Sequence, residues 1–174
     1  MRNPPDETLG ATETLPSSPP ASGRGGMNLH PLIRHSPHPD HPGWWTWDID
    51  GPDRFNTTIA PLLVRKGDDG RGWCRMFPEG KHANLGRVVH GGAMMTFIDM
   101  ALFAGGAMTG ANVARAVTLD CSVQFLGPAA IGSPLNAEVE LLRETGRLAF
   151  LRGRVLQEEQ LVAAFTGTLR KAPK

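Results

Sequence analysis

The stretch His90-Gly91-Gly92-Ala93-Met94-Met95-Thr96-Phe97-Ile98-Asp99-Met100-Ala101-Leu102-Phe103-Ala104 decides the fold of this chain. It predicts a helix of about a dozen residues that is apolar on nearly every side and ends near Gly105-Gly106. A helix with no wet face is expected to lie in the interior of a domain, not on its surface. Whatever surrounds this helix must therefore cover it on all sides.

Two features of this helix raise the free energy of the folded state unless other groups interact with them. Asp99 is the only acidic residue in the run, and a buried carboxylate costs several kcal/mol unless it is paired, hydrogen-bonded or protonated. The helix start, His90-Gly91-Gly92, offers no Ser, Thr, Asp or Asn cap, so we expect free backbone N–H groups there. Such groups bind a carbonyl oxygen or an anion, and glycine, which has no Cβ, allows a ligand to approach the backbone closely. Each feature also has a purely structural interpretation, as a hydrogen-bond hub and a tight turn.

The segments on either side of the helix predict strands. Before it, residues 61–66 and 72–77 flank the turn Gly67-Asp68-Asp69-Gly70. After it, the apolar period changes to two over residues 117–125, where alternate residues from Leu119 to Phe125 share one face and Thr118 to Gln124 the other. Residues 135–141, 148–156 and 161–169 continue this pattern. One helix wrapped by an antiparallel sheet predicts an α+β domain.

Composition excludes several classes of protein. The 174 residues are 40% hydrophobic and 20% charged with a formal net charge of +1, which predicts no nucleic-acid or membrane partner. Cys74 and Cys121 stand in no metal or redox spacing, so we expect a reducing compartment, the cytoplasm, and no metal. The first residues lack the apolar core of a signal peptide, and the helix is expected to be too short to span a bilayer. No nucleotide-binding fingerprint is present, and no cofactor is expected.

The N-terminal part differs from the rest in composition. Residues 1–43 are rich in Pro, Gly, Ser and His, and we expect them to be disordered or loosely packed, with the domain over 44–174. His35, His38 and His41 recur every three residues, but the intervening prolines and the lack of a second ligand cluster favour a linker over a metal site. The run Trp44-Trp45-Thr46-Trp47 indicates packing against the sheet, with a ligand groove as the alternative.

The run Asn84-Leu85-Gly86-Arg87-Val88-Val89-His90-Gly91-Gly92, followed by Asp99, resembles the signature of hotdog-fold acyl-CoA thioesterases. The similarity is closest to the phenylacetate-degradation and 4-hydroxybenzoyl-CoA thioesterase type and covers roughly residues 55–170. It implies the hotdog fold and hydrolysis of an acyl thioester. It also implies a homodimer with shared active sites, within a dimer of dimers (a homotetramer).

The resemblance also implies roles for individual residues. Asp99 is the expected nucleophile or general base, and the Gly91 N–H the expected oxyanion donor. The expected catalytic set includes Asn84, which holds water or the carbonyl, Thr118, which orients water or the carboxylate, and His90. Gly92, Thr96 and Val117 are the expected substrate-binding residues.

Physical chemistry points the same way, because thioester hydrolysis needs an oxyanion site together with a base or nucleophile. A free helix N-terminus can act as the oxyanion site, and the Asp99 carboxylate can act as the base or nucleophile. The sequence contains no Gly-x-Ser-x-Gly motif that would indicate a serine nucleophile instead. Two alternatives stay open. One is a hotdog acyl-thioester dehydratase or hydratase, which usually pairs a His with a carboxylate, and the other is a non-catalytic acyl-CoA binding domain. The carrier, CoA or protein-bound pantetheine, is also open.

The spacing of Gly91 and Asp99 along the helix bears on whether two subunits share one active site. Asp99 follows Gly91 by eight residues, which separates their backbones by roughly 12 Å along a helix. A single thioester carbon cannot contact both groups of one helix, because reacting atoms must lie within about 3–3.5 Å. A two-fold related partner removes the conflict by placing its Asp99 opposite Gly91 and Asn84 of the first subunit.

Overall fold

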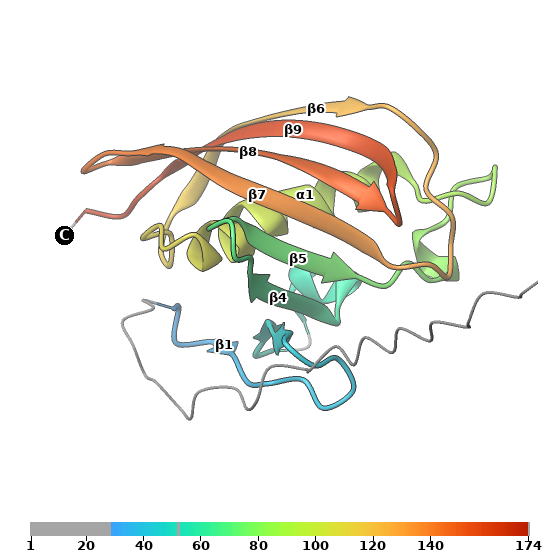
Figure 1. Ribbon diagram of the computed structural model, residues 1–174, viewed down its shortest axis with the longest axis horizontal. Coiled ribbons are helices and arrows are strands. Elements are labelled where there is room, and N and C mark those ends of the chain that lie inside the picture. The colour runs from blue at the N-terminus through green and yellow to red at the C-terminus, as the bar shows by residue number, and fades with distance from the viewer. Residues whose placement is uncertain (1–28, 52, 174) are drawn as a thin grey trace, which may run out of the picture.

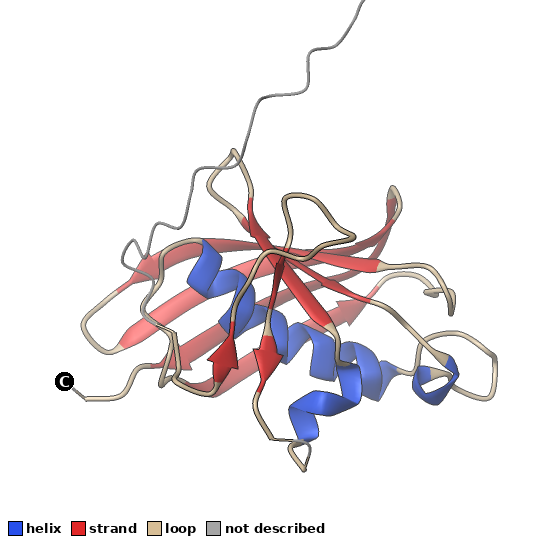
Figure 2. Ribbon diagram, turned by 90° about the horizontal axis from the view of Figure 1, so that it is seen from below, coloured by secondary structure: helices blue, strands red, loops and turns tan. Residues whose placement is uncertain are grey.

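The computed structural model describes residues 29–51 and 53–173. One long helix, α1 (Gly91–Met108), lies across one face of a seven-stranded sheet whose paired strands all run antiparallel (Figures 1 and 2). The sheet order is β2-β4-β5-β7-β8-β9-β6. These strands span Trp45–Thr46 (β2), Leu62–Lys66 (β4), Gly72–Met76 (β5), Val117–Phe125 (β6), Leu135–Glu144 (β7), Leu148–Gln157 (β8) and Gln160–Arg170 (β9). The predicted α+β architecture, a helix wrapped by an antiparallel sheet in the hotdog arrangement, is confirmed.

The helix is longer than the sequence predicts, with 18 residues in place of about a dozen. Gly105 and Gly106 do not end it; they bring it close to the sheet. A Cβ on Gly105 would lie 2.5 Å from Cγ2 of Val139, and one on Gly72 would lie 1.9 Å from the Gly105 carbonyl oxygen. The helix ends instead before Gly110, which has φ +94° and donates its N–H to the Ala107 carbonyl. The two glycines are therefore packing residues.

This extra length also corrects the expectation that the helix is too short for a bilayer. By length and composition α1 is long and apolar enough to cross a membrane, and among the described residues it is the one helix that passes this test. However, 61% of it is buried inside the domain. Phe97, Ile98, Ala101 and Leu102 are fully buried. Its apolar character is thus used in packing against the sheet.

Strand β6 departs from the predicted alternation. Its register on β9 shifts between Thr118 and Asp120, so that Leu119 is the extra residue of a β-bulge. Beyond the bulge, Cys121 and Val123 pair with Gly167 and Phe165. Before it, Thr118 pairs with Leu169, which is fully buried under α1.

Directly paired residues point to the same face of a sheet, so the bulge moves Thr118 to the inner face. Leu119, predicted to face the core, is 55% exposed. The prediction that Thr118 shares the face of Asp120 is wrong for this reason.

Residues 29–51 lie in Figure 1 on the side of α1 away from β8 and β9. Two short strands, β1 (Ile33–Arg34) and β3 (Asp48–Ile49), pair with each other, and Leu29, Ile33 and Ile49 pack against the core. The part of the expected loose segment that the structure describes, residues 29–43, thus contributes to the domain, while residues 1–28 lie outside the described residues. Two short 3₁₀ helices, η1 (Phe55–Ile59) and η2 (Gly80–His82), complete the list of elements.

The tryptophan run divides between two environments. Trp44 and Trp47 are buried at 7% and 5% exposure, and Trp47 packs in the core, as the packing interpretation predicts, but it also lines the pocket described below, as the alternative predicts. Trp45 is 37% exposed and stacks on His35 at 4.9 Å between ring centroids. The rings of His38 and His41 contact each other, and the His41 ring also contacts Phe77. In the described part of the chain, no three His, Cys, Asp or Glu residues come together as a metal site.

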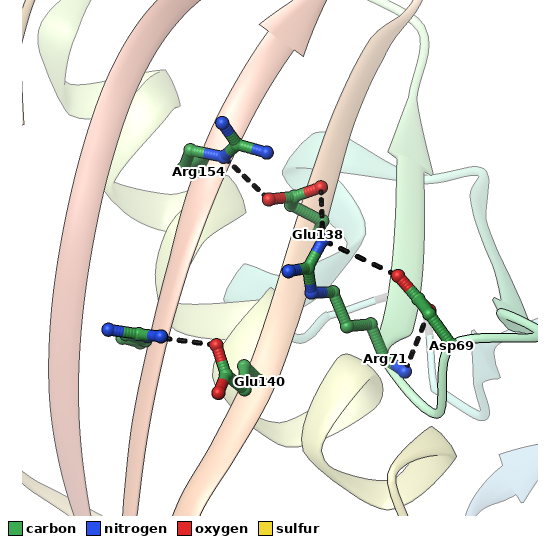
Figure 3. A network of polar contacts seen from close by, with 6 residues as sticks. Asp69, Arg71, Glu138, Glu140 and Arg154 are labelled. Carbon is green, nitrogen blue, oxygen red and sulfur yellow. Dashed lines mark hydrogen bonds and ion pairs between the residues drawn. The ribbon is translucent and has the colours of Figure 1, made fainter.

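The outer face of the sheet carries a network of ion pairs (Figure 3). Glu138 lies between Arg154 and Arg71, and Arg71 also contacts Asp69. In the neighbouring ion pair, Nε of Arg152 lies 2.8 Å from Oε2 of Glu140. The Glu138 side chain is only 9% exposed, so two arginines compensate its partial desolvation. Glu138 and Glu140 are therefore both paired within one chain.

Candidate active site

The start of α1 is capped, contrary to expectation. Nδ1 of His90 accepts the Gly92 N–H at 2.8 Å, so His90 takes the place of the absent Ser, Thr, Asp or Asn. Among the described residues, no acceptor bonds the Gly91 N–H. The cap therefore leaves the Gly91 N–H free at the positive end of the helix dipole.

His82, just before the Asn84 motif, holds this start in place. It is 5% exposed; its Nδ1 accepts the Glu79 N–H and its Nε2 bonds the Thr58 carbonyl, both at 2.8 Å. Its own carbonyl accepts the His90 N–H at 2.8 Å. Because the ring accepts at Nδ1, the proton sits on Nε2. No sequence motif marks this residue, since its partners come from η1 and η2.

Asn84 shapes the loop before the helix. Its Oδ1 accepts the N–H groups of Gly86 at 2.8 Å and Val88 at 3.3 Å, as in an Asx turn. The turn places Arg87 at φ +60°. The side-chain amide donors of Asn84 have no partner among the described residues, so they are available to a carbonyl or water.

Asp99 and Thr118 meet across the gap between α1 and β6. The Thr118 hydroxyl donates to Oδ1 of Asp99 at 2.7 Å. The bulge at Leu119 makes this possible, because it moves Thr118 to the face of β6 that looks at the helix. The pair leaves Oδ2 of Asp99 free of partners among the described residues. The structure thus gives the helical acid a fixed orientation and one unengaged oxygen.

The sequence predicts a buried Asp99, but in the single chain Asp99 is only half-buried. The helix side that carries it faces β6, the last strand of the sheet, and the part of the chain that the structure describes places no further strand beyond it. The desolvation that an interior position would impose is therefore incomplete within one chain.

Cys121 is a rival nucleophile near Asp99. Burial raises the pKa of its thiol, and the negative charges of Asp99 and Asp120 raise it further. The thiol is therefore protonated at neutral pH, and a thiol is a poor nucleophile compared with a thiolate. The other cysteine, Cys74, is fully buried under α1, and burial raises its pKa as well. Neither cysteine competes with the carboxylate.

The remaining expected substrate residues lie at different places. The Thr96 hydroxyl donates to the Gly92 carbonyl at 2.9 Å, within one turn of α1. Val117 is 48% exposed at the start of β6. The expected residues therefore form two groups in one chain: Asn84, His90, Gly91, Gly92 and Thr96 at the helix start, and Asp99 with Thr118 and Val117 at β6. The structure does not bring these groups together within the chain.

Two hollows adjoin the Asp99 group. One is an apolar pocket of about 180 Å³ between α1 and residues 29–49, with Asp99 in its wall. The other is an open groove of about 980 Å³ lined by Val117 and by the basic side chains of Arg115, Arg147, Arg170 and Lys171. Of these, Lys171 pairs with Glu144, and no acid pairs with the three arginines among the described residues. Arg115 and Arg147 are candidate phosphate contacts from the sequence as well, together with Arg152 and Arg154, which lie outside this groove; because the lining comes from three separate segments, no local pattern indicates the groove as a whole.

Comparisons with known proteins bear on the family and the fold. Residues 86–164 match the thioesterase superfamily. Over 87 residues the chain is 31% identical to a Pseudomonas aeruginosa protein named "Putative esterase PA0474"; the match covers 50% of this chain and 65% of that protein. The chain therefore spans less than two thirds of this curated relative.

Solved structures show the same fold. A mutant form of the phenylacetic acid degradation protein PaaI from Thermus thermophilus is 27% identical, with a TM-score of 0.58, over 69% of this chain and all of that one. A hypothetical thioesterase from Streptococcus pneumoniae, solved with coenzyme A, is 18% identical with a TM-score of 0.55, over 65% of this chain and 87% of that one. At that identity the likeness concerns the fold alone.

Proposed function

We propose that this protein, which has the hotdog fold and whose residues 86–164 match the thioesterase superfamily, hydrolyses an acyl-CoA thioester to the free acid and CoA. The observation that carries the proposal is the Asp99 carboxylate, which Thr118 orients and which lies in the wall of an apolar pocket, while Val117, the neighbour of Thr118, lines a basic groove. An acyl thioester of CoA has the same two parts, one apolar and one carrying phosphates. Thioester hydrolysis in general is what the family match supports; the acyl-CoA substrate is part of the proposal.

The residues divide the chemistry between them. Oδ2 of Asp99 either attacks the thioester carbon, giving an acyl anhydride that water then cleaves, or removes a proton from the attacking water. In both routes the C–S bond breaks, the sulfur leaves with a proton, and water supplies the new carboxylic oxygen. The Gly91 N–H stabilises the charge that develops on the carbonyl oxygen, and the Asn84 amide donates to the carbonyl or holds water.

The active site is shared between two subunits in this proposal. Asp99 and the Gly91 N–H lie roughly 12 Å apart on one helix, too far for one substrate carbon to contact both. Strand β6, next to Asp99, is an edge strand with exposed apolar side chains, including Leu119 and Phe125, each 55% exposed. Two copies joined along β6 by a two-fold axis would place Asp99 of one opposite Gly91 of the other, twice.

The basic groove supports CoA over a carrier-bound thioester. Arg115, Arg147 and Arg170 gather in this groove, are exposed and have no acid partner among the described residues. Arginine binds phosphate through charge-assisted hydrogen bonds. Val117 lines this groove and its neighbour Thr118 bonds Asp99, so the groove begins next to the proposed reactive group.

The alternatives fit less well. A dehydratase or hydratase would be expected to pair a His with the acid, and the only side-chain bond to Asp99 among the described residues comes from Thr118, while His90 is engaged as the helix cap. A non-catalytic binding domain has no need of a carboxylate held in a fixed orientation. Both alternatives predict no release of free thiol from acyl-CoA.

The test is thiol release from acetyl-, hexanoyl-, phenylacetyl- and palmitoyl-CoA, with hydration of an enoyl-CoA followed in parallel. We expect hydrolysis of at least one acyl-CoA and a loss of about a thousandfold or more in kcat for Asp99→Asn, since several kcal/mol of barrier lowering disappear. Asp120→Asn, a change of an exposed acid on the neighbouring strand β6, is the matched control and should retain activity. Hydrolysis by Asp99→Asn within tenfold of the parent would contradict the mechanism.

A further inference from the structure

The apolar pocket beside Asp99, called here the Asp99 pocket, has walls from two parts of the chain. Leu29, Ile33, Trp47 and Ile49 come from the N-terminal segment, and Met100 and Phe103 come from α1. Asp99 lies in the same wall as Met100. The pocket therefore opens on the group that the proposed function places at the reaction.

The N-terminal wall lies outside the family match, which covers residues 86–164 and so includes the α1 wall but not residues 29–49. These residues are held in place by backbone pairing of Ile33 with Ile49, by the Asp50 N–H bond to the Leu32 carbonyl, and by the burial of Trp47. The segment thus forms a fixed wall of the pocket.

The chemistry of the lining favours an apolar occupant. The polar residues in the wall besides Asp99 are His30 and Asn56, and both have local partners. Nδ1 of His30 accepts the Leu32 N–H at 3.2 Å, and the Asn56 amide contacts Sδ of Met100 at 2.6 Å. A charged or strongly polar ligand would find few free groups here, whereas an acyl chain or ring would remove apolar surface from water.

The size of the pocket sets the size of that occupant. Its volume is about 180 Å³, and an apolar cavity of about 150 Å³ suffices to bind benzene. We propose that the Asp99 pocket binds the acyl group of the substrate, and that residues 29–49 limit this group to about the size of a phenyl ring or a six-carbon chain. This inference rests on the proposed function, because it takes Asp99 as the group that meets the thioester.

The experiment compares kcat/KM for acetyl-, hexanoyl-, phenylacetyl- and palmitoyl-CoA in the wild-type full-length protein and three variants. Ala114→Phe fills the pocket from the loop after α1, Ile33→Ala widens it, and Leu32→Ala is the matched control, since Leu32 is the neighbour of Ile33 but does not line the pocket. One methylene in an apolar pocket changes kcat/KM by about 10–200-fold.

We expect wild type to prefer hexanoyl- or phenylacetyl-CoA over the other two substrates. Ala114→Phe should lower the phenylacetyl-to-acetyl ratio of kcat/KM by about tenfold or more. Ile33→Ala should move the preference toward longer chains, and Leu32→Ala should leave the ratios unchanged. If palmitoyl-CoA is hydrolysed as well as phenylacetyl-CoA, or if Ala114→Phe leaves the ratio unchanged in an active enzyme, the pocket proposal is overturned and hydrolysis stands.

A binding measurement separates the two proposals. Calorimetry of Asp99→Asn protein with intact phenylacetyl-CoA and with CoA alone reports the contribution of the acyl group without turnover. We expect tighter binding of phenylacetyl-CoA, with a negative heat-capacity change, and loss of this advantage when Ala114→Phe is added. If that pattern appears although wild type hydrolyses no acyl-CoA, the pocket proposal holds and the hydrolase proposal fails. Equal affinity for both ligands overturns the pocket proposal.

Discussion

The two edges of the main sheet differ in how their outer hydrogen-bonding groups are covered. One edge is β2, two residues long, and residues 36–38 lie along it: the Thr46 N–H bonds the Ser36 carbonyl at 2.8 Å and the His38 N–H bonds the Trp44 carbonyl at 2.9 Å. The other edge is β6, nine residues long, with no strand beyond it in the described chain. Proteins usually keep edge strands short, covered or charged.

This contrast indicates which edge of the sheet is covered within one chain and which edge is left open to a second subunit. At the β2 edge the N-terminal segment supplies both backbone partners and the wall of a pocket. At the β6 edge, Val117, Leu119 and Phe125 are exposed: Val117 and Leu119 flank Thr118, which bonds the half-buried Asp99, and the Phe125 ring lies at Gly91. An exposed apolar edge next to a proposed reactive carboxylate is what a shared active site requires. The predictions below change one edge at a time.

The largest effect is expected from a charge on the β6 edge. Phe125→Asp should convert a dimer into a monomer and lower kcat/KM by about a hundredfold or more, because a carboxylate would be buried in the interface without a partner. Light scattering and thiol release measure both effects. Trp45→Asp, an equally drastic change of a 37% exposed aromatic on β2, is the control and should leave the oligomeric state unchanged. A Phe125→Asp protein that stays dimeric and active would place the interface elsewhere.

The second prediction concerns which residues meet across the interface. Asp99→Asn and Asn84→Ala are each expected to be inactive. Mixed under conditions of subunit exchange, they form heterodimers with one doubly defective site and one intact site. Activity should return to about a quarter of wild type for statistical mixing. If exchange is demonstrated and no activity returns, the two residues do not act in one shared site.

A smaller effect is expected at the bulge. Thr118→Val keeps the shape of the side chain but removes the hydroxyl that orients Asp99, so kcat should fall by about tenfold with little change in KM. Steady-state kinetics measures the two constants separately. Ser122→Ala, which removes another hydroxyl from β6, is the control and should behave as wild type. An unchanged kcat in Thr118→Val would make the Asp99–Thr118 bond structural only.

The smallest effects are expected from shortening the chain at the β2 side. Removing residues 1–26 should change neither melting temperature nor activity, because that segment is poor in apolar residues. Removing residues 1–43 should lower the melting temperature by several degrees, because Leu29 and Ile33 pack against the core and residues 36–38 cover β2. Equal melting temperatures for the two shortened proteins would show that residues 29–43 add no stability.

Much of the fold follows from the sequence. The central helix and the six longer strands are predicted within a few residues, because each depends on a period of apolar residues that a short segment carries by itself. The motif from Asn84 to Asp99 likewise indicates the candidate site, since glycines at a helix start and a lone acid in an apolar helix are unusual locally.

Other features depend on contacts between distant segments, which periodicity does not encode. Gly105 and Gly106 are a helix stop by local rules, but Val139 and Leu151 lie so close that only glycine fits there and the helix continues. His90 is no standard cap, yet it acts as one because the His82 carbonyl and the loop behind it fix its position.

The sequence by itself thus determined the helix, the strands and the identity of the acid. Tertiary structure decided what surrounds the acid: the bulge at Leu119 moves Thr118 to Asp99, and residues 29–49 close a pocket against a helix that begins some 40 residues later. The physical reason is that apolar period is a property of neighbours along the chain. Register shifts and pocket walls depend on how segments that are distant in the sequence pack against one another. They are therefore determined only by the packing of the whole domain.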